Sequence, residues 1–133
     1  MDTTTAFTKI IKGEIPTKII YEDNDHFAFL SIEPFEKGHT VVIPKKAYEN
    51  IFEIPENELR ELITIVQRIA KHYRKTLNCG INISQNNLPI SGQAVNHIHF
   101  HVIPRLEKKE FYTGDNTKYL THEMELWKNK LKL

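Results

Sequence analysis

The feature that most constrains this chain is a stretch in which histidine alternates with apolar residues, HIHFHVI at residues 97–103. Successive side chains of a β-strand point to opposite faces of a sheet, so we predict a strand over residues 95–103 with its three histidines on one face. The apolar residues between them then face the core. Histidine is costly to bury without polar partners, so three in such a row indicate chemistry rather than packing.

Two kinds of chemistry use histidines in this arrangement. Neighbouring imidazoles on one face of a strand are about 6.6–6.8 Å apart, a gap that holds a small tetrahedral group. A neutral imidazole can attack phosphorus there while its neighbours stabilise the charge on the phosphoryl oxygens. Alternatively, two of the histidines and a ligand from elsewhere in the chain bind a metal ion such as zinc.

The loop that precedes this strand favours phosphate. It is rich in amide and hydroxyl groups, carried by Asn86, Asn87, Ser91 and Gln93. Gly92 lets the backbone approach a ligand closely, because glycine has no side chain. We therefore expect a phosphate-bearing ligand beside the histidines.

The remaining pattern predicts an α+β domain with an antiparallel sheet. Short β-branched or alternating runs predict strands at residues 18–22, 27–30, 39–43 and 81–85. The polar residues between the first two of these runs predict a hairpin. Threonines near the N-terminus cap a short helix that ends at Gly13.

A long amphipathic helix is predicted after Pro55. Its apolar residues recur at steps of three and four, and we expect them all in the core: Leu59, Leu62, Ile63, Val66, Ile69, Ala70, Tyr73 and Leu77. Asn78 ends this helix. A weaker pattern of the same kind predicts a second amphipathic helix in the C-terminal segment, through Leu120, Met124, Trp127 and Leu131.

Composition excludes several classes of partner. The 133 residues suit one domain, and the formal net charge of +1, with basic and acidic residues interleaved, argues against a nucleic-acid partner. Cys79 is the single cysteine, so no internal disulfide forms. The N-terminus does not resemble a signal peptide, and no apolar run approaches the about 20 residues of a membrane span. We expect a cytoplasmic protein with no membrane partner.

The sequence resembles the histidine triad (HIT) family, whose signature is His-φ-His-φ-His-φ-φ with φ apolar. HIHFHVI matches this signature, while residues 7–46 and 82–105 resemble the two halves of family members in the same order. The resemblance implies a five-stranded antiparallel sheet with one long and one short helix. Residues 1–106 are then the nucleotide-binding catalytic domain, and residues 107–133 a C-terminal helical extension packed on the same domain or on a partner subunit. A homodimer that joins sheets and long helices is also implied.

The resemblance further implies the roles of four histidines. Family members bind a purine nucleoside monophosphate moiety and cleave the bond between its α-phosphorus and a leaving group. By position, His99 is the nucleophile, and His97 orients it through a backbone carbonyl contact that leaves the attacking nitrogen unprotonated. His101 holds phosphate oxygens, and His39 packs behind the triad.

Other matching positions are implied to contact the nucleotide. Gln93 contacts the phosphate or the leaving group, and Asn86 the phosphate or the ribose, with Gly92 between them in the loop. A flat purine ring binds well between apolar walls, and the resemblance places that slot at Phe7, Ile10, Phe29 and Ile32.

Five positions depart from the family pattern, and one of them is Ala47, which replaces a histidine that is common near this point. Ser31 stands where many members contact the ribose with Asp or Asn, and a serine makes fewer hydrogen bonds. Ala94 stands where phosphoramidases often have a hydroxyl near the leaving group. Thr5 and Thr8 replace the cysteines of zinc-carrying members, so we predict no structural zinc and no other protein-bound metal.

These features favour a hydrolase or transferase that acts on a purine nucleotide conjugate, such as a nucleoside phosphoramidate, through a nucleotidyl-histidine intermediate. No cofactor is required. The alternative within this class is a diadenosine polyphosphate hydrolase, for which Mg²⁺ can accompany the polyphosphate. Two functions from other classes also stay open: the protein is a nucleotide-binding module without turnover, or it is a metal-dependent hydrolase.

Overall fold

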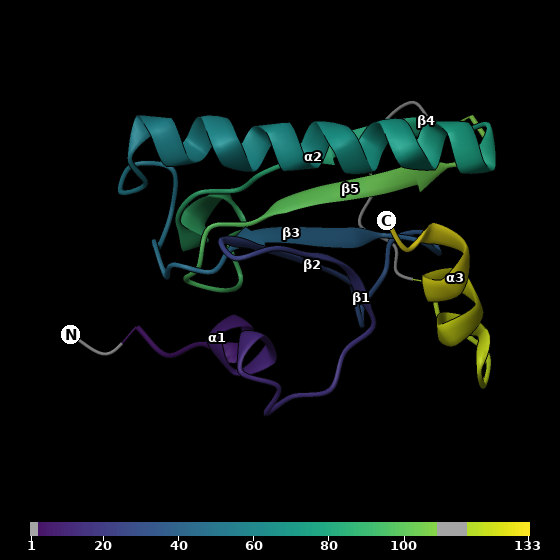
Figure 1. Cartoon of the computed structure of the whole chain (residues 1–133), viewed down its shortest axis with the longest axis horizontal. Coiled ribbons are helices and arrows are strands. Elements are labelled where there is room, and N and C mark those ends of the chain that lie inside the picture. The colour runs from purple at the N-terminus through teal and green to yellow at the C-terminus, as the bar shows by residue number, and fades with distance from the viewer. Residues whose placement is uncertain (1–2, 109–116) are drawn as a thin grey trace.

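The structure is a computed structural model that describes residues 3–108 and 117–133. Its centre is a five-stranded sheet with the strand order β1-β2-β3-β5-β4. Every neighbouring pair is antiparallel, which confirms the predicted α+β class. The strands are β1 (Ile19–Glu22), β2 (His26–Leu30), β3 (Thr40–Pro44), β4 (Gly80–Ser84) and β5 (Phe100–Arg105) (Figure 1).

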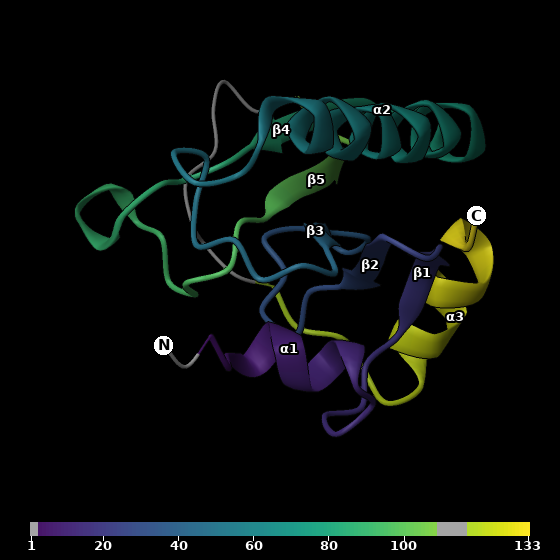
Figure 2. The same cartoon turned by 60° about the vertical axis from the view of Figure 1, so that its left-hand side comes forward.

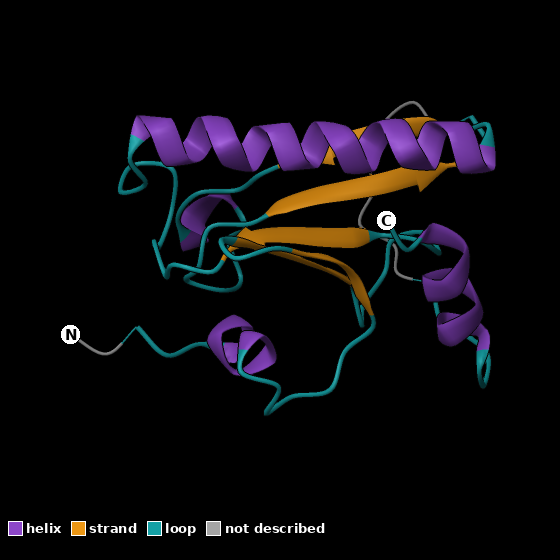
Figure 3. Cartoon of the chain, viewed as in Figure 1, coloured by secondary structure: helices purple, strands orange, loops and turns teal. Residues whose placement is uncertain are grey.

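Helices cover the two faces of this sheet differently. The 22-residue helix α2 (Glu56–Leu77) runs along one face, and the six-residue helix α1 (Ala6–Ile11) lies on the other side (Figures 1 and 3). The sheet supplies apolar residues to both sides, so the protein has two cores. The larger core lies under α2 and includes Ile98, Phe100 and Val102. The smaller one gathers around Phe7 of α1.

Helix α2 forms much as its periodicity predicts. It ends at Asn78, which takes a left-handed backbone conformation, and Leu62, Val66, Ile69 and Tyr73 are buried. The expectation that the whole apolar stripe lies in the core holds in part: Leu59, Ala70 and Leu77 are half-buried against the core, whereas Ile63 is exposed. The side chain of Ile63 is 41% exposed, because it lies beyond the edge of the sheet-facing stripe, towards the outer strand β4.

Helix α1 is short because signals at both ends confine it. Thr5 caps its N-terminus, accepting hydrogen bonds from the backbone N–H groups of Phe7 and Thr8. At the other end Gly13 has a φ of +78°, a conformation that favours glycine and stops the helix. The predicted helix therefore occurs within residues 3–13.

Strand β5 begins later than the predicted strand. Residues 95–99 bond elsewhere: the N–H of His97 donates to the carbonyl oxygen of Val95, and that of Ile98 to the carbonyl oxygen of Tyr48. The sheet ladder starts only at Phe100. The predicted alternation of side chains between the two faces nevertheless holds across this irregular segment.

The C-terminal segment packs on the same domain. Helix α3 (Glu123–Leu131) lies beside β1, where Lys18 forms an ion pair with Glu125 (Figure 2). Leu131 is fully buried in the larger core, and the N–H of Leu133 donates to the carbonyl oxygen of Ile20. Residues 109–116 of the predicted extension lie outside the described residues. Within residues 3–108 and 117–133, no helix is long and apolar enough to cross a membrane.

Candidate active site

The three histidines of the motif lie on the α1 face of the sheet. His97 and His99 are buried, and His101 is half-buried at the register position opposite Val41 of β3. The ring of Phe7 makes T-shaped contacts with both buried rings, with centroid distances of 5.9 Å to His97 and 5.0 Å to His99. The rings of His99 and His101 are 5.0 Å apart. The alternating pattern therefore brings the motif histidines together on one side.

The orientation of His99 is set by the backbone just before it. Its Nδ1 lies 2.8 Å from the carbonyl oxygen of His97. A carbonyl oxygen only accepts, so Nδ1 carries the proton and Nε2 keeps a free electron pair. Burial lowers the pKa of His99 below its ordinary value of 6.5, which favours this neutral form.

His97 is anchored in turn by the end of β3. Its Nε2 donates to the carbonyl oxygen of Pro44 at 2.7 Å. Burial lowers the pKa of His97, which favours the neutral ring, and its Nδ1 is then an unprotonated nitrogen without a hydrogen-bond partner among the described residues. The His97 side chain thus holds the segment whose carbonyl orients His99.

A second chain of hydrogen bonds fixes the tautomer of His101. The backbone N–H of Phe35 donates to Nδ1 of His39 at 3.1 Å, so in a neutral ring the proton of His39 is on Nε2. That nitrogen lies 2.9 Å from Nδ1 of His101 and donates to it. Nδ1 of His101 is then an acceptor, which places the proton of a neutral His101 on Nε2.

Burial keeps both of these rings neutral. It lowers the pKa of His39 to about 3, with the neighbouring His101 and Arg105 as smaller causes. It also lowers the pKa of His101 to about 4, with His99 as a smaller cause. At neutral pH the site therefore offers an unprotonated nitrogen at His99 and an N–H donor at His101.

Comparison with known proteins identifies the family. A model described as "HIT domain" matches residues 12–108. The chain belongs to the HIT family. An uncharacterised HIT-like protein of Methanocaldococcus jannaschii is 50% identical over 101 residues, covering 76% of this chain and 78% of that protein. An adenosine 5′-monophosphoramidase of Saccharomyces cerevisiae is 38% identical over 109 residues, covering 82% of this chain and 67% of the yeast protein.

A solved structure supports the same assignment. The crystal structure of a HIT-like protein from Bartonella henselae, described as involved in cell-cycle regulation, superposes with a TM-score of 0.88. The two chains are 39% identical, and the match covers 99% of this chain and 96% of the other. The predicted HIT-like fold is therefore confirmed.

The loop before the HIT motif is braced by Gln93. Its side-chain nitrogen donates to the carbonyl oxygens of Glu49 and Val95, at 2.6 and 2.9 Å, and its oxygen accepts from the N–H of Leu88 at 2.7 Å. Both amide hydrogens are used within the protein, so the predicted contact between Gln93 and phosphate stays a prediction. Gly92 has a φ of +93° and lies against the side chain of Asn86.

The predicted base slot is brought together in part. The rings of Phe7 and Phe29 are 5.5 Å apart, and Ile10 packs on the same apolar cluster. Ile32 is largely exposed, beyond the end of β2. Next to it, the hydroxyl oxygen of Ser31 accepts a hydrogen bond from the backbone N–H of Glu33, so the serine retains one hydrogen to donate. Ala94 is exposed beside Gln93.

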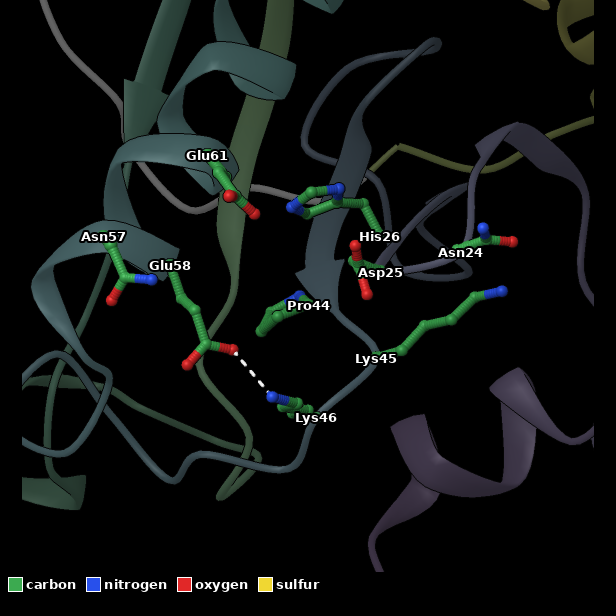
Figure 4. Close-up of a pocket in the computed structure, with 9 residues that line it drawn as sticks. All are labelled: Asn24, Asp25, His26, Pro44, Lys45, Lys46, Asn57, Glu58 and Glu61. Carbon is green, nitrogen blue, oxygen red and sulfur yellow. Dashed lines mark ion pairs between the residues drawn. The ribbon is translucent and has the colours of Figure 1, made fainter.

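A separate cavity of about 460 Å³ lies between the end of β3 and the first turns of α2 (Figure 4). Two lysines at this cavity form ion pairs, Lys46 with Glu58 and Lys45 with Glu22, and Nδ1 of His26 lies 3.0 Å from a carboxylate oxygen of Asp23. None of the four histidines of the candidate active site, His39, His97, His99 and His101, lines this cavity. His26 itself is buried and held by Asp23.

Sequence reasoning missed two groups that shape the site. The backbone N–H of Phe35 sets the tautomer of His39, and the carbonyl oxygen of Pro44 anchors His97. Both are main-chain groups. Every residue type except proline has a backbone N–H, and every residue type has a carbonyl oxygen. No side-chain pattern signals them. Only the proximity of Pro44 to the HIT strand across the sheet reveals its role.

Proposed function

We propose that this chain hydrolyses purine nucleotide conjugates at the α-phosphate, with Nε2 of His99 as the nucleophile. One observation carries the proposal: the hydrogen bond from Nδ1 of His99 to the carbonyl oxygen of His97 leaves Nε2 unprotonated and able to attack. The name of the yeast relative adds support, because an adenosine 5′-monophosphoramidase acts on this substrate class.

The reaction has two steps. Nε2 of His99 forms a bond to the α-phosphorus while the bond from phosphorus to the leaving group breaks, and the leaving group departs with the bonding pair and takes up a proton from solvent. The product is a nucleotidyl-His99 intermediate. Water then attacks the same phosphorus while the bond from phosphorus to Nε2 breaks, and the attacking water gives up a proton to solvent. This step releases the nucleoside monophosphate and neutral His99.

His101 stabilises the charge that develops in both steps. Its Nε2–H is a fixed donor because His39 holds its other nitrogen, and the ring lies 5.0 Å from that of His99. A donor already oriented toward phosphoryl oxygens needs no rearrangement during the reaction. The purine is proposed to bind against Phe7 and Phe29, with Ser31 donating to the ribose. Asn86 and Gly92 supply further polar contacts from the loop.

The test compares His99→Ala with the unaltered protein on adenosine 5′-monophosphoramidate. We expect turnover to fall at least about 10³-fold while AMP still binds by calorimetry. His72→Ala is the matched control, because His72 lies on α2 outside the site and that variant should keep full activity. Full activity in His99→Ala contradicts the nucleophile assignment, and AMP binding without turnover by the unaltered protein indicates a binding module instead. Rates on diadenosine polyphosphate with Mg²⁺ test the alternative substrate.

We infer that α1 holds no structural zinc. The hydroxyl oxygens of Thr5 and Thr8 are committed to the helix cap, accepting from the N–H groups of Phe7 and Thr5 at 3.1 and 2.8 Å. Across residues 3–108 and 117–133, no group of three histidine, cysteine or acidic side chains is arranged to hold a metal. Elemental analysis of purified protein should find less than about one-tenth of a zinc per chain, whereas one zinc per chain contradicts this.

A homodimer is proposed across β4 and α2. In the described sheet β4 is an edge strand, and its Ile83 is 50% exposed. Ile83, Ile81 and Ile63 line an apolar groove of about 440 Å³ between β4 and α2. An unpaired strand edge with exposed apolar side chains is suited to a second copy, whose identical surface meets it about a two-fold axis.

A further inference from the structure

The loop at residues 34–38, here called the His39 loop, is held at both ends by one distant segment. At its C-terminal end, the N–H of Gly38 donates to the hydroxyl oxygen of Tyr119 at 2.9 Å. At its N-terminal end, the N–H of Thr117 donates to the carbonyl oxygen of Pro34 at 2.8 Å. The described part of the C-terminal segment thus clamps the loop immediately before His39.

Packing and charge reinforce this clamp. Lys37 forms an ion pair with Glu123 of α3 at 2.7 Å. Gly38 has a φ of +92°, and a Cβ atom there would lie only 2.9 Å from Pro104 and 3.1 Å from Leu131. The backbone of the loop therefore lies directly against α3 and β5, so its position depends on where the C-terminal segment packs.

The clamped loop contains the donor that sets the proton of His39. Phe35 follows the Pro34 end of the clamp, its N–H donates to Nδ1 of His39, and its ring stacks on the imidazole at 5.4 Å with an interplanar angle of 23°. The N–H of His39 itself donates to the carbonyl oxygen of Glu36 at 3.0 Å. A shift of either loop end would move the Phe35 N–H away from the imidazole.

We propose that Tyr119 is a positioning residue for the phosphate-binding histidine. Its hydroxyl, together with the N–H of Thr117, holds the Phe35 N–H on Nδ1 of His39, and this places a proton on Nε2 of His101. Without the clamp, His39 takes the other tautomer and accepts from Nδ1–H of His101. His101 then presents an electron pair, which repels phosphoryl oxygens, in place of an N–H. The effect on catalysis rests on the proposed function, whereas the effect on the tautomers does not.

The direct test is ¹⁵N NMR of histidine-labelled protein, because ring-nitrogen shifts distinguish the two neutral tautomers. In the unaltered protein we expect His39 and His101 each to carry the proton on Nε2. Tyr119→Phe should show a mixture of tautomers at both rings. Tyr48→Phe is the matched control: it removes a tyrosine hydroxyl bonded to Glu58, away from the His39 loop, and should leave both tautomers unchanged. Unchanged tautomers in Tyr119→Phe overturn the proposal.

Kinetics add a second readout. If the proposed reaction occurs, Tyr119→Phe should lower kcat about tenfold or more with little change in KM, since the missing donor acts mainly in the transition state. If the unaltered protein proves inactive while the tautomers change as expected, the proposed function fails and the positioning role stands. If the protein is active and Tyr119→Phe changes neither tautomers nor kcat, the positioning role fails alone.

A folding control completes the experiment. Trp127, the single tryptophan of the chain, lies in α3 against Gly38, so its fluorescence reports whether the C-terminal segment remains packed. If Tyr119→Phe does not fold, the variant Thr117→Pro is used instead in the NMR comparison. This variant removes the backbone N–H donor at the other end of the clamp. A change of tautomer in that folded variant supports the proposal, and no change overturns it.

Discussion

The Nδ1 nitrogen of His99 lies 2.8 Å from the carbonyl oxygen of His97, two residues earlier in the chain. The contact is local, yet it depends on a distant one, because the His97 ring is itself held by the carbonyl oxygen of Pro44. The nitrogen proposed as the nucleophile is thus oriented by main-chain oxygens, which do not change protonation with pH.

The first prediction concerns the pH dependence of the reaction. Burial lowers the pKa of His99 below 6.5, and in the proposed reaction only the neutral ring attacks phosphorus. We therefore expect kcat/KM to stay level as the pH is lowered from 8 to about 6.5, and to fall only at more acidic pH. Steady-state assays across this range check it. A fall that is half complete above pH 7 would mean that His99 is not protected from protonation.

The second prediction concerns stability in acid. The pKa of His39 is about 3 and that of His101 about 4 in the folded protein, both below the ordinary 6.5, so the unfolded chain binds more protons in between. Their contribution to stability is complete above pH 6.5 and is lost as the pH falls toward 4. As the pH falls through this window, His39 and His101 each lower the free energy of unfolding by about 1.4 kcal/mol per pH unit.

Urea unfolding at pH 7 and pH 5 measures this loss above the range in which carboxyl groups titrate. His39→Gln removes one of the two groups and should show a smaller difference between the two pH values. Equal stability of the unaltered protein at pH 7 and pH 5 contradicts the prediction.

The third prediction concerns backbone strain beside the site. Leu88 has a φ of +74° and a ψ of 148°, a conformation that is essentially restricted to glycine. Leu88→Gly relieves this strain and should raise the free energy of unfolding by about 1 kcal/mol. Ile90→Gly in the same turn is the control, because Ile90 has no positive φ and its replacement should give no gain. Equal effects of the two changes in urea unfolding would argue against strain at Leu88.

The fourth prediction concerns the proposed dimer. Ile83→Lys places a charge in the apolar groove between β4 and α2, and burying an unpaired charge is costly. We expect analytical ultracentrifugation to find a dimer for the unaltered protein and a monomer for this variant. Ile90→Lys is the control, since Ile90 is 96% exposed outside the groove and should leave the dimer intact. A monomeric unaltered protein contradicts the dimer itself.

Apolar patterning predicted most of the fold. Helix α2 buries one face and follows a period of 3.6 residues, whereas β2 and β3 are buried on both faces and were predicted from their runs of apolar and β-branched residues. The start of β5 did not follow, because the N–H groups of His97 and Ile98 bond to Val95 and Tyr48 rather than to a neighbouring strand. Nothing in the apolar pattern distinguishes an irregular segment from a strand when both alternate between the same faces.

The candidate site was predictable to the extent that its side chains carry the chemistry. The histidines at 97, 99 and 101 form a motif, and His39 was found by resemblance. The groups that set their tautomers were not predictable, because the N–H of Phe35 and the hydroxyl of Tyr119 act through contacts between segments far apart in the sequence. Such contacts follow from the folded arrangement and leave no periodic trace.

The clamp on residues 34–38 has a consequence for how the protein matures during synthesis. Gly38 and its partner Tyr119 are separated by 81 positions. The ribosome therefore makes the loop, the five strands and the histidine motif before it makes Tyr119, whose hydroxyl oxygen accepts from the loop. A nascent chain that stops short of Tyr119 contains every imidazole of the site, yet nothing from the C-terminal side fixes their protons. The proposed arrangement of protons is therefore set only when the C-terminal segment packs against residues 34–38, at the same time as Leu131 fills its place in the larger core.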